Sequence, residues 1–173
     1  MAERAVTAVD DGRHDFDFFY GRWQQQNRKR ADLLVRDDVS WIEFESRTEV
    51  FPILGGLGNV DTFKAPRFPG RPGFEGCSLR LFDPGTGLWR IWWASTIGHG
   101  QLDPPVVGRF RNGVGVFEGE DVVDGVSLRV RFTWKAITGS SATWEQAFSL
   151  DDGESWDTNW IMQSARVTPT RAA

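Results

Sequence analysis

Turn signals at short intervals are the feature that most constrains the fold of this chain. From Gly21 onward, short segments rich in Val, Ile, Phe, Trp and Thr are separated by clusters of Gly, Asp, Asn and Pro. This pattern is typical of an all-β protein. We expect ten strands, near residues 22–35, 39–51, 58–64, 76–83, 88–95, 105–111, 114–120, 126–136, 141–150 and 157–168.

Several connections between these segments are tight. Residues 82–89 (FDPGTGLW) begin a turn with Asp-Pro and place Gly87 where a positive φ is needed. Residues 111–115 (RNGVG) contain Asn-Gly, the strongest two-residue hairpin signal. So many sequential hairpins predict an antiparallel up-and-down meander, and closing about ten strands into a barrel removes the exposed edges. A two-sheet sandwich is the alternative.

The length of 173 residues fits a single domain. We expect a flexible N-terminus over residues 1–13, the barrel over residues 14–168 and a C-terminal tail over residues 169–173. Before the first strand, residues 14–20 (HDFDFFY) predict a short helix that caps the barrel. Phe16, Phe19 and Tyr20 would share its inner face.

Composition argues against several classes of function. The first fifteen residues hold no apolar run suited to a signal sequence, and eighteen apolar residues never follow one another, so we expect a cytoplasmic protein with no membrane partner. A net charge of -4, with both signs scattered, argues against nucleic acid as a partner. Cys77 is the single cysteine, and His14 and His99 are the only histidines, so we expect neither a disulfide nor a metal site.

Large aromatic residues are unusually abundant. Nine Trp and thirteen Phe stand against one Tyr, which is more than a small core needs for packing alone. We therefore expect rings to line an internal cavity.

Residues 21–23 (GRW) resemble the Gly-x-Trp that opens the first strand in lipocalins and related calycin barrels. In that superfamily an Arg of the last strand packs over this Trp at the closed end, so the resemblance gives Gly21, Trp23 and Arg166 structural roles. Because the last strand of an up-and-down barrel runs antiparallel beside the first, Trp23 and Arg166 should touch. Most of the chain, including LGGLGNVDTF and WEQAFSLDDGESWDTNWIM, also resembles a group of bacterial lipocalin-like proteins with no agreed activity.

Nitrobindin-type calycins, which also have ten strands, bind haem through a histidine near the C-terminus. The last two expected strands of this chain contain no histidine, and the glycine-rich continuation after the first Trp of those proteins is replaced by QQQNRKR. We therefore expect no haem and no other cofactor.

Alternation along the strands predicts which side chains face the interior. An inward Trp23 places Gln25 and Asn27 on the inner face. An inward Arg166 does the same for Ser164, Met162 and Trp160 if no bulge intervenes. A loop over residues 151–154 would then set Trp160 opposite Glu145.

The middle strands are less determined. In the hairpin over residues 77–93, Arg80 and Trp93 share one face and Cys77 and Trp92 the other, and either face could be the inner one. Residues 127–134 (SLRVRFTW) alternate cleanly, so the apolar set should face inward and Arg129 and Arg131 should face water.

These placements favour a binding module that holds a small, partly apolar organic molecule. Arg109, like Arg80, is a candidate for fixing a ligand carboxylate. The candidate ligand-binding residues are Asn27, Arg80, Trp93, Glu145, Trp160 and Met162.

The alternative is a cofactor-independent enzyme, an isomerase, cyclase, dehydratase or hydrolase. Glu145 against an indole, or His99 in a loop at the barrel mouth, would transfer the proton. A third hypothesis is an oligomerisation domain that uses exposed Trp as its interface, and we expect a monomer or a homodimer.

Overall fold

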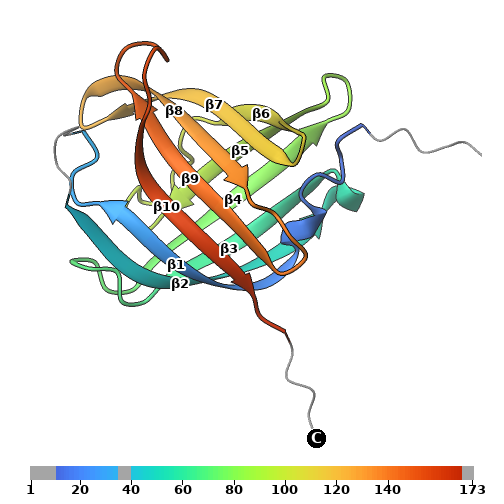
Figure 1. Cartoon of the computed structure of the whole chain (residues 1–173), viewed down its shortest axis with the longest axis horizontal. Helices are drawn as coiled ribbons and strands as arrows, with labels where there is room; N and C mark the ends of the chain where they lie inside the picture. Colours follow the sequence, from blue (N-terminus) through green and yellow to red (C-terminus); the bar gives the residue numbers. More distant parts are fainter. Residues whose placement is uncertain (1–10, 35–39, 169–173) are drawn as a thin grey trace, which may run out of the picture.

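A computed structural model describes residues 11–34 and 40–168 of the chain. Ten antiparallel strands close into one barrel in which each strand pairs with its neighbours in the chain and β1 pairs with β10 (Figure 1). The strands are β1 (Gly21–Arg30), β2 (Trp41–Ile53), β3 (Gly58–Ala65), β4 (Phe74–Asp83), β5 (Leu88–Ser95), β6 (Val106–Arg111), β7 (Val114–Val123), β8 (Val126–Lys135), β9 (Ser141–Ser149) and β10 (Asp157–Arg166). The predicted all-β barrel is confirmed, and the sandwich alternative is wrong.

Local turn chemistry explains why the chain reverses where it does. Asn112 and Gly113 have φ values of 52° and 76°, and they connect β6 to β7 through the closing pair Arg111 and Val114. Two consecutive positive φ values define the tight hairpin turn whose twist matches that of the flanking strands. Asp124 and Gly125 repeat this geometry between β7 and β8, with φ values of 49° and 79°.

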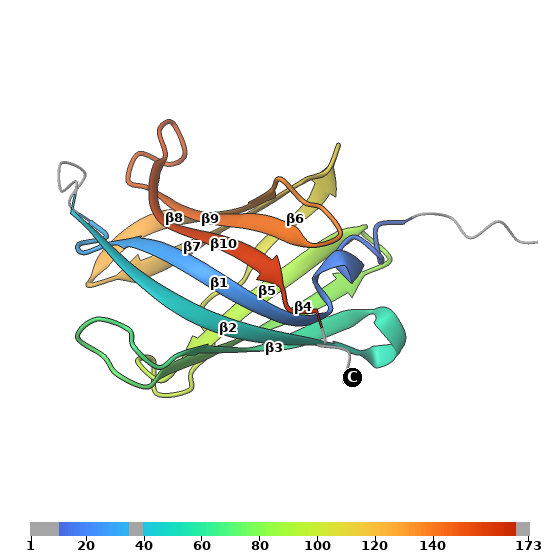
Figure 2. The same ribbon diagram turned by 60° about the horizontal axis from the view of Figure 1, so that its bottom comes forward.

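One end of the barrel is filled by the segment that precedes β1. This segment forms the short 3-10 helix η1 (Asp17–Phe19), which lies at one end of the barrel in both ribbon views (Figure 2). Phe16 and Phe19 are fully buried there. The Phe19 ring meets Trp134 edge-on with centroids 4.6 Å apart, and Phe16 meets Trp89 at 5.0 Å. The barrel therefore has one end closed by aromatic rings.

The pairing around the barrel is uneven. Ten residue pairs join β1 to β2, whereas three join β5 to β6, from Trp89 with Gly108 to Ile91 with Val106. The ladder between β5 and β6 ends at Ile91, and the connection over residues 96–105 follows the end of β5. This connection returns to β5 through a hydrogen bond from the Asp103 backbone amide to the Trp93 carbonyl oxygen, 2.7 Å long.

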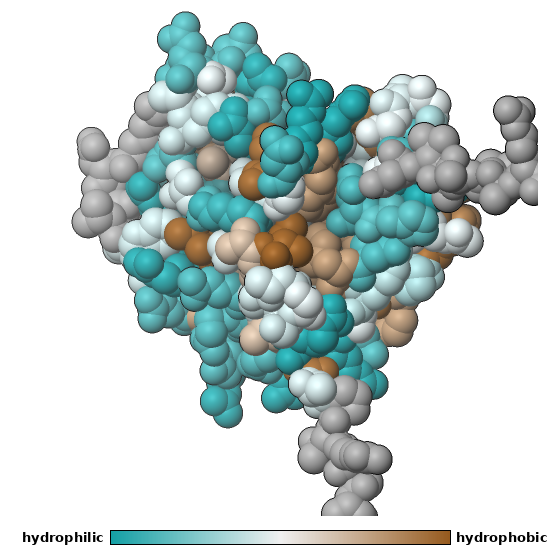
Figure 3. Space-filling view, turned by 45° about the vertical axis from the view of Figure 1, so that its right-hand side comes forward, coloured by the Kyte–Doolittle hydropathy of each residue, from teal (hydrophilic) through white to brown (hydrophobic). Residues whose placement is uncertain are grey.

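The outer surface is mixed in polarity. A space-filling view that brings the η1 side forward shows small hydrophobic areas among hydrophilic residues (Figure 3). Arg129 and Arg131 point outward as predicted, and Glu118 accepts a 2.8 Å hydrogen bond from Nε of Arg131. All nine Trp lie within the described ranges, and each is buried or partly buried. The hypothesis of an oligomer interface built on Trp stays a prediction.

Parts of the expected domain layout lie outside the described residues. These are residues 1–10 of the predicted flexible N-terminus, residues 35–39 between the first two strands, and the predicted tail over residues 169–173. Residues 11–13 are described, and the Gly12 carbonyl oxygen accepts a hydrogen bond from the Trp89 indole nitrogen at 2.9 Å. Across the described ranges, no helix has the length and apolar character needed to cross a bilayer.

Candidate functional site

The closed end is held together by Arg166, the last residue of β10. Its guanidinium carbon lies 4.4 Å from the centre of the Trp23 ring, so the predicted contact is present. The same guanidinium donates hydrogen bonds to the carbonyl oxygens of Phe18, Tyr20 (2.6 Å) and Gly139 (2.8 Å). Gly21 has a φ of 96°, a conformation that side chains disfavour, and it turns the chain from η1 into β1.

A belt of polar side chains crosses the interior above this closed end. The Gln25 carbonyl oxygen accepts hydrogen bonds from the hydroxyls of Ser46 (2.9 Å) and Thr48 (2.8 Å), and its amide donates to Ser164 (3.2 Å). Because these buried groups satisfy one another, the belt is a rigid part of the wall.

The next inward residue on β1, Asn27, belongs to the same belt. Its amide nitrogen donates to Ser46 at 2.8 Å, and its carbonyl oxygen accepts from the indole nitrogen of Trp160 at 3.0 Å. Asn27 is thus buried and committed to protein partners, and it fixes the orientation of the Trp160 ring.

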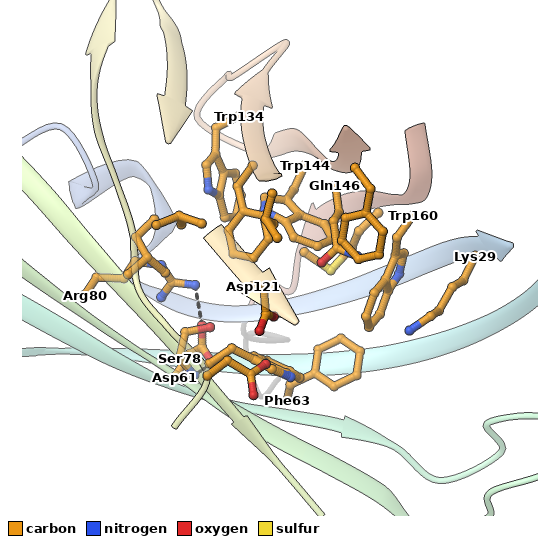
Figure 4. Close-up of a pocket in the computed structure, with 18 of the residues that line it drawn as sticks. Lys29, Asp61, Phe63, Ser78, Arg80, Asp121, Trp134, Trp144, Gln146 and Trp160 are labelled. Carbon is orange, nitrogen blue, oxygen red and sulfur yellow. Dashed lines mark hydrogen bonds and ion pairs between the residues drawn. The ribbon is translucent and has the colours of Figure 1, made fainter. Parts of the chain in front are cut away.

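A cavity of about 210 Å³ occupies the interior between this belt and the opposite end of the barrel. Its walls are more apolar than polar and include several aromatic rings, of which Figure 4 shows Trp134, Trp144 and Trp160. The cavity reaches the surface at the end away from η1, where Asp103, Pro104 and Glu120 line it and are exposed. We call this exposed end the mouth.

Arg80 and Asp61 form a buried ion pair deep in the cavity (Figure 4). Nη2 of Arg80 lies 2.6 Å from the Asp61 carboxylate, and Nη1 donates to the Asn59 carbonyl oxygen at 2.9 Å. The guanidinium carbon lies 5.5 Å from the centre of the Phe19 ring and 5.9 Å from that of Trp134. The pair is therefore enclosed by the rings that close the barrel.

The Nε nitrogen of Arg80 differs from its two Nη nitrogens, each of which donates a hydrogen bond. The Asp61 carboxylate also accepts the Ser78 backbone amide at 2.8 Å, so both partners are fixed in position. Within the described part of the chain, the buried Nε of Arg80 has no hydrogen-bond partner. A buried donor left unpaired costs about 1–3 kcal/mol, and an acceptor on a bound molecule would recover that cost.

Lys29 is the cation at the other end of the cavity. Its Nζ lies 4.1 Å from the centre of the Trp160 ring, and Figure 4 shows it on the opposite side of the pocket from Arg80. Burial, with the positive charge of Arg71 as a second cause, lowers the pKa of Lys29 to about 8. Burial opposes the charged form of an amine, so this side chain is easily neutralised.

The mouth carries carboxylates. Asp121 lies on the inner face of β7 opposite the buried Leu128, and Asp103 lies in the connection after β5. Partial burial and the neighbouring Asp121 carboxylate raise the pKa of Asp103. Like charges at the mouth disfavour a second anion nearby.

The structure brings most of the expected ligand-binding residues to the interior. Arg80, Trp93, Trp160 and Met162 line the cavity. The hairpin of β4 and β5 therefore turns the face with Arg80 and Trp93 inward, with Ser78 opposite Trp93 and Arg80 opposite Ile91.

The predicted partner of Trp160 is wrong, and Glu145 lies outside the cavity. The predicted register holds at the start of β10, where Asp157 pairs with Phe148, but a bulge at Asn159 shifts it, so that Trp160 faces Gln146. Glu145 consequently projects from the outer face, where it forms a 2.7 Å ion pair with Lys135. It is in no position to meet a ligand in the cavity.

His99 and Arg109 also lie away from the cavity. His99 is exposed in the connection after β5, with a φ of 55°, and it does not line the pocket. Arg109 is exposed on β6 and contacts the Thr86 carbonyl oxygen at 3.4 Å. Neither Glu145 nor His99 is therefore placed to transfer a proton within the cavity.

The cavity contains polar residues that the sequence interpretation missed, chiefly Lys29, Asp61 and Gln146. Lys29 follows Asn27 by two positions, so the same alternation that turns Asn27 inward would have found it. Gln146 donates to the Asn159 carbonyl oxygen at 2.9 Å and lines the cavity (Figure 4). No group of three or more His, Cys, Asp or Glu side chains in the described ranges is arranged to hold a metal ion.

These features define a fold, the closed ten-stranded antiparallel barrel of the lipocalin-like type, with an internal cavity. The fold is similar to that of the S-type phycobiliprotein lyase CPES from Guillardia theta, with a TM-score of 0.59 over 92% of this chain and 97% of the other. The two sequences are 8% identical, so the likeness concerns the fold. No protein-family model and no curated protein sequence matches this chain.

Proposed function

We propose that this protein binds a small, partly apolar organic molecule inside the barrel. The observation that carries the proposal is the largely apolar cavity of about 210 Å³, with several aromatic rings in its wall and a fixed Arg80 and Asp61 pair in its depth. Ligand sites are typically apolar concavities with a few well-placed polar groups. Tryptophan and phenylalanine rings supply apolar contact, and the polar groups at the two ends orient the molecule.

The polar groups suggest how the ligand lies. Arg80 offers its unused Nε donor to an acceptor at the deep end, and Gln146 and Lys29 offer polar contacts nearer the mouth. The middle of the cavity is bounded by rings such as Phe63, Trp93 and Trp144. A ligand with an apolar, unsaturated body and polar atoms at both ends matches this arrangement.

Tryptophan fluorescence tests the proposal directly, since four of the rings that line the cavity are indoles. We expect members of a broad library of aromatic and apolar compounds to quench it saturably. Trp93→Phe should weaken that binding, because Trp93 lines the cavity. Trp92→Phe is the matched control, because Trp92 directly precedes Trp93 in β5 but lies on the outer face of the barrel, opposite Leu79.

Native mass spectrometry of the freshly purified protein provides an independent readout. A co-purified mass that is released on unfolding would support the proposal and give the chemistry of the ligand. Failure of every library compound to alter the fluorescence would refute it, and equal effects of Trp92→Phe and Trp93→Phe would move any binding away from the cavity.

A further inference from the structure

Lys29 stands apart from the other basic residues of the chain. The sequence contains seventeen Arg and three Lys. Lys64 and Lys135 lie on the outer face of the barrel and pair with Glu75 (3.7 Å) and Glu145 (2.7 Å). Lys29 instead lines the cavity, and the structure gives it no ion-pair partner among residues 11–34 and 40–168.

The difference between lysine and arginine matters at this position. Arginine stays protonated in proteins, whereas a buried lysine releases its proton and becomes a nucleophile. With the pKa of Lys29 lowered to about 8, roughly a quarter of the amine is neutral near pH 7.5. An amine at the usual value of 10.5 would be neutral in roughly one molecule in a thousand.

The surroundings of Lys29 disfavour its protonated form and offer a surface for an unsaturated group. The side chain is largely withdrawn from solvent, and the positive charge of Arg71 acts on it. The Trp160 ring, 4.1 Å from Nζ, provides the flat apolar surface on which an unsaturated group can lie. A carbonyl carbon is the electrophile with which a desolvated amine reacts reversibly.

We propose that Lys29 forms a reversible imine with an aldehyde or ketone group of the bound molecule. The inference rests on the proposed function and names its ligand class, partly apolar carbonyl compounds. In the reaction, the neutral Nζ adds to the carbonyl carbon, and a proton passes from nitrogen to oxygen to give the carbinolamine. The oxygen then leaves as water while nitrogen loses its second proton and the C=N bond forms, so no oxidant or reductant is needed.

Reductive trapping tests this inference with two matched probes. The aldehyde is 2-naphthaldehyde, and 2-naphthalenemethanol is the analogue of similar shape that cannot form an imine. The full-length protein is incubated with each compound and sodium cyanoborohydride, which reduces an imine to a stable amine. Peptide mass spectrometry then locates the adduct, and tryptophan fluorescence measures binding of the alcohol.

We expect trapping at Lys29 to be about tenfold or more faster than at Lys64 or Lys135, because the cavity holds the aldehyde beside Lys29 and the other two lysines lie on the outer face. Lys29→Arg keeps the charge and should abolish the adduct, and Lys29→Met is a second variant in case the larger side chain disturbs the barrel. Lys64→Arg and Lys135→Arg should label as the wild type does. Circular dichroism verifies that each variant is folded.

The two proposals fail in different ways. If the alcohol binds but the adduct is spread equally over the three lysines, the imine is refuted and ligand binding stands. The imine is also refuted, and ligand binding again stands, if folded Lys29→Arg or Lys29→Met protein yields as much adduct as the wild type. If no adduct forms at Lys29 the imine is refuted, and if in addition no library compound alters the fluorescence, ligand binding is refuted as well.

Discussion

Replacing Lys29 with Met should stabilise the protein near neutral pH. Burial lowers the pKa of Lys29 from 10.5 to about 8, so the folded state disfavours the charged amine. Each unit of difference corresponds to about 1.4 kcal/mol, which gives a penalty on the order of 3 kcal/mol when the amine is charged. Residual contact with solvent reduces this to about 2–3 kcal/mol. Methionine has a similar length and no charge to bury.

The sign of the pH dependence follows from the direction of the shift. Below the folded pKa of about 8, both states hold the proton and the wild type bears the whole penalty. Between that value and 10.5, the unfolded state binds more protons than the folded state, so the stability of the wild type rises with pH. The advantage of Lys29→Met should therefore shrink by roughly 1–2 kcal/mol between about pH 6.5 and pH 9.5.

Urea unfolding followed by tryptophan fluorescence measures this difference at several pH values. Both proteins share every other titrating group, so the comparison isolates Lys29. A stability difference that stays constant from about pH 6.5 to pH 9.5 would refute the reasoning. A wild type more stable than Lys29→Met at the lower pH would do the same.

Two further predictions concern the cavity wall. Asp61→Asn should lower the free energy of unfolding in urea by about 3–5 kcal/mol, because it leaves the Arg80 charge buried without its partner. Glu145→Gln, at the surface pair with Lys135, should lower it by at most about 1 kcal/mol. Equal losses of stability would contradict the assigned burial. Gly76→Ala should cost about 1–3 kcal/mol and weaken ligand binding, because its Cβ would lie 2.3 Å from the Trp93 ring. Gly139→Ala is its control, since a Cβ added at Gly139 would have no atom within 4 Å apart from those of its chain neighbours. Matching melting temperatures for the two alanine variants would show that Trp93 has room to move.

The strands and their order were predictable because the signals are local. Asn112 with Gly113, and Gly87 in the loop after β4, fix reversals through their own backbone preferences. Once the reversals are known, the up-and-down barrel follows from the need to pair every edge. The contact between Trp23 and Arg166 then results from the pairing of the first and last strands.

The polar part of the site depends on interactions between distant strands, and the sequence carries weaker signals for these. The bulge at Asn159 is accompanied by a hydrogen bond from Gln146 on β9, so the sequence of β10 alone does not predict it. For this reason Glu145 was predicted to lie opposite Trp160. Asp61 and Arg80 lie on different strands and become partners through the register of β3 and β4. Strand alternation alone would have placed Lys29 on the inner face. It was not predicted there because a charged residue near the end of a strand is ordinarily assigned to solvent.

The short ladder between β5 and β6 affects how the barrel responds to mechanical strain. A closed cylinder of strands yields first at its weakest joint, and here that joint consists of three residue pairs. The joint adjoins Trp93, whose carbonyl oxygen accepts the Asp103 amide at the mouth. Widening the barrel beside the cavity would therefore break fewer ladder hydrogen bonds at this joint than between β1 and β2.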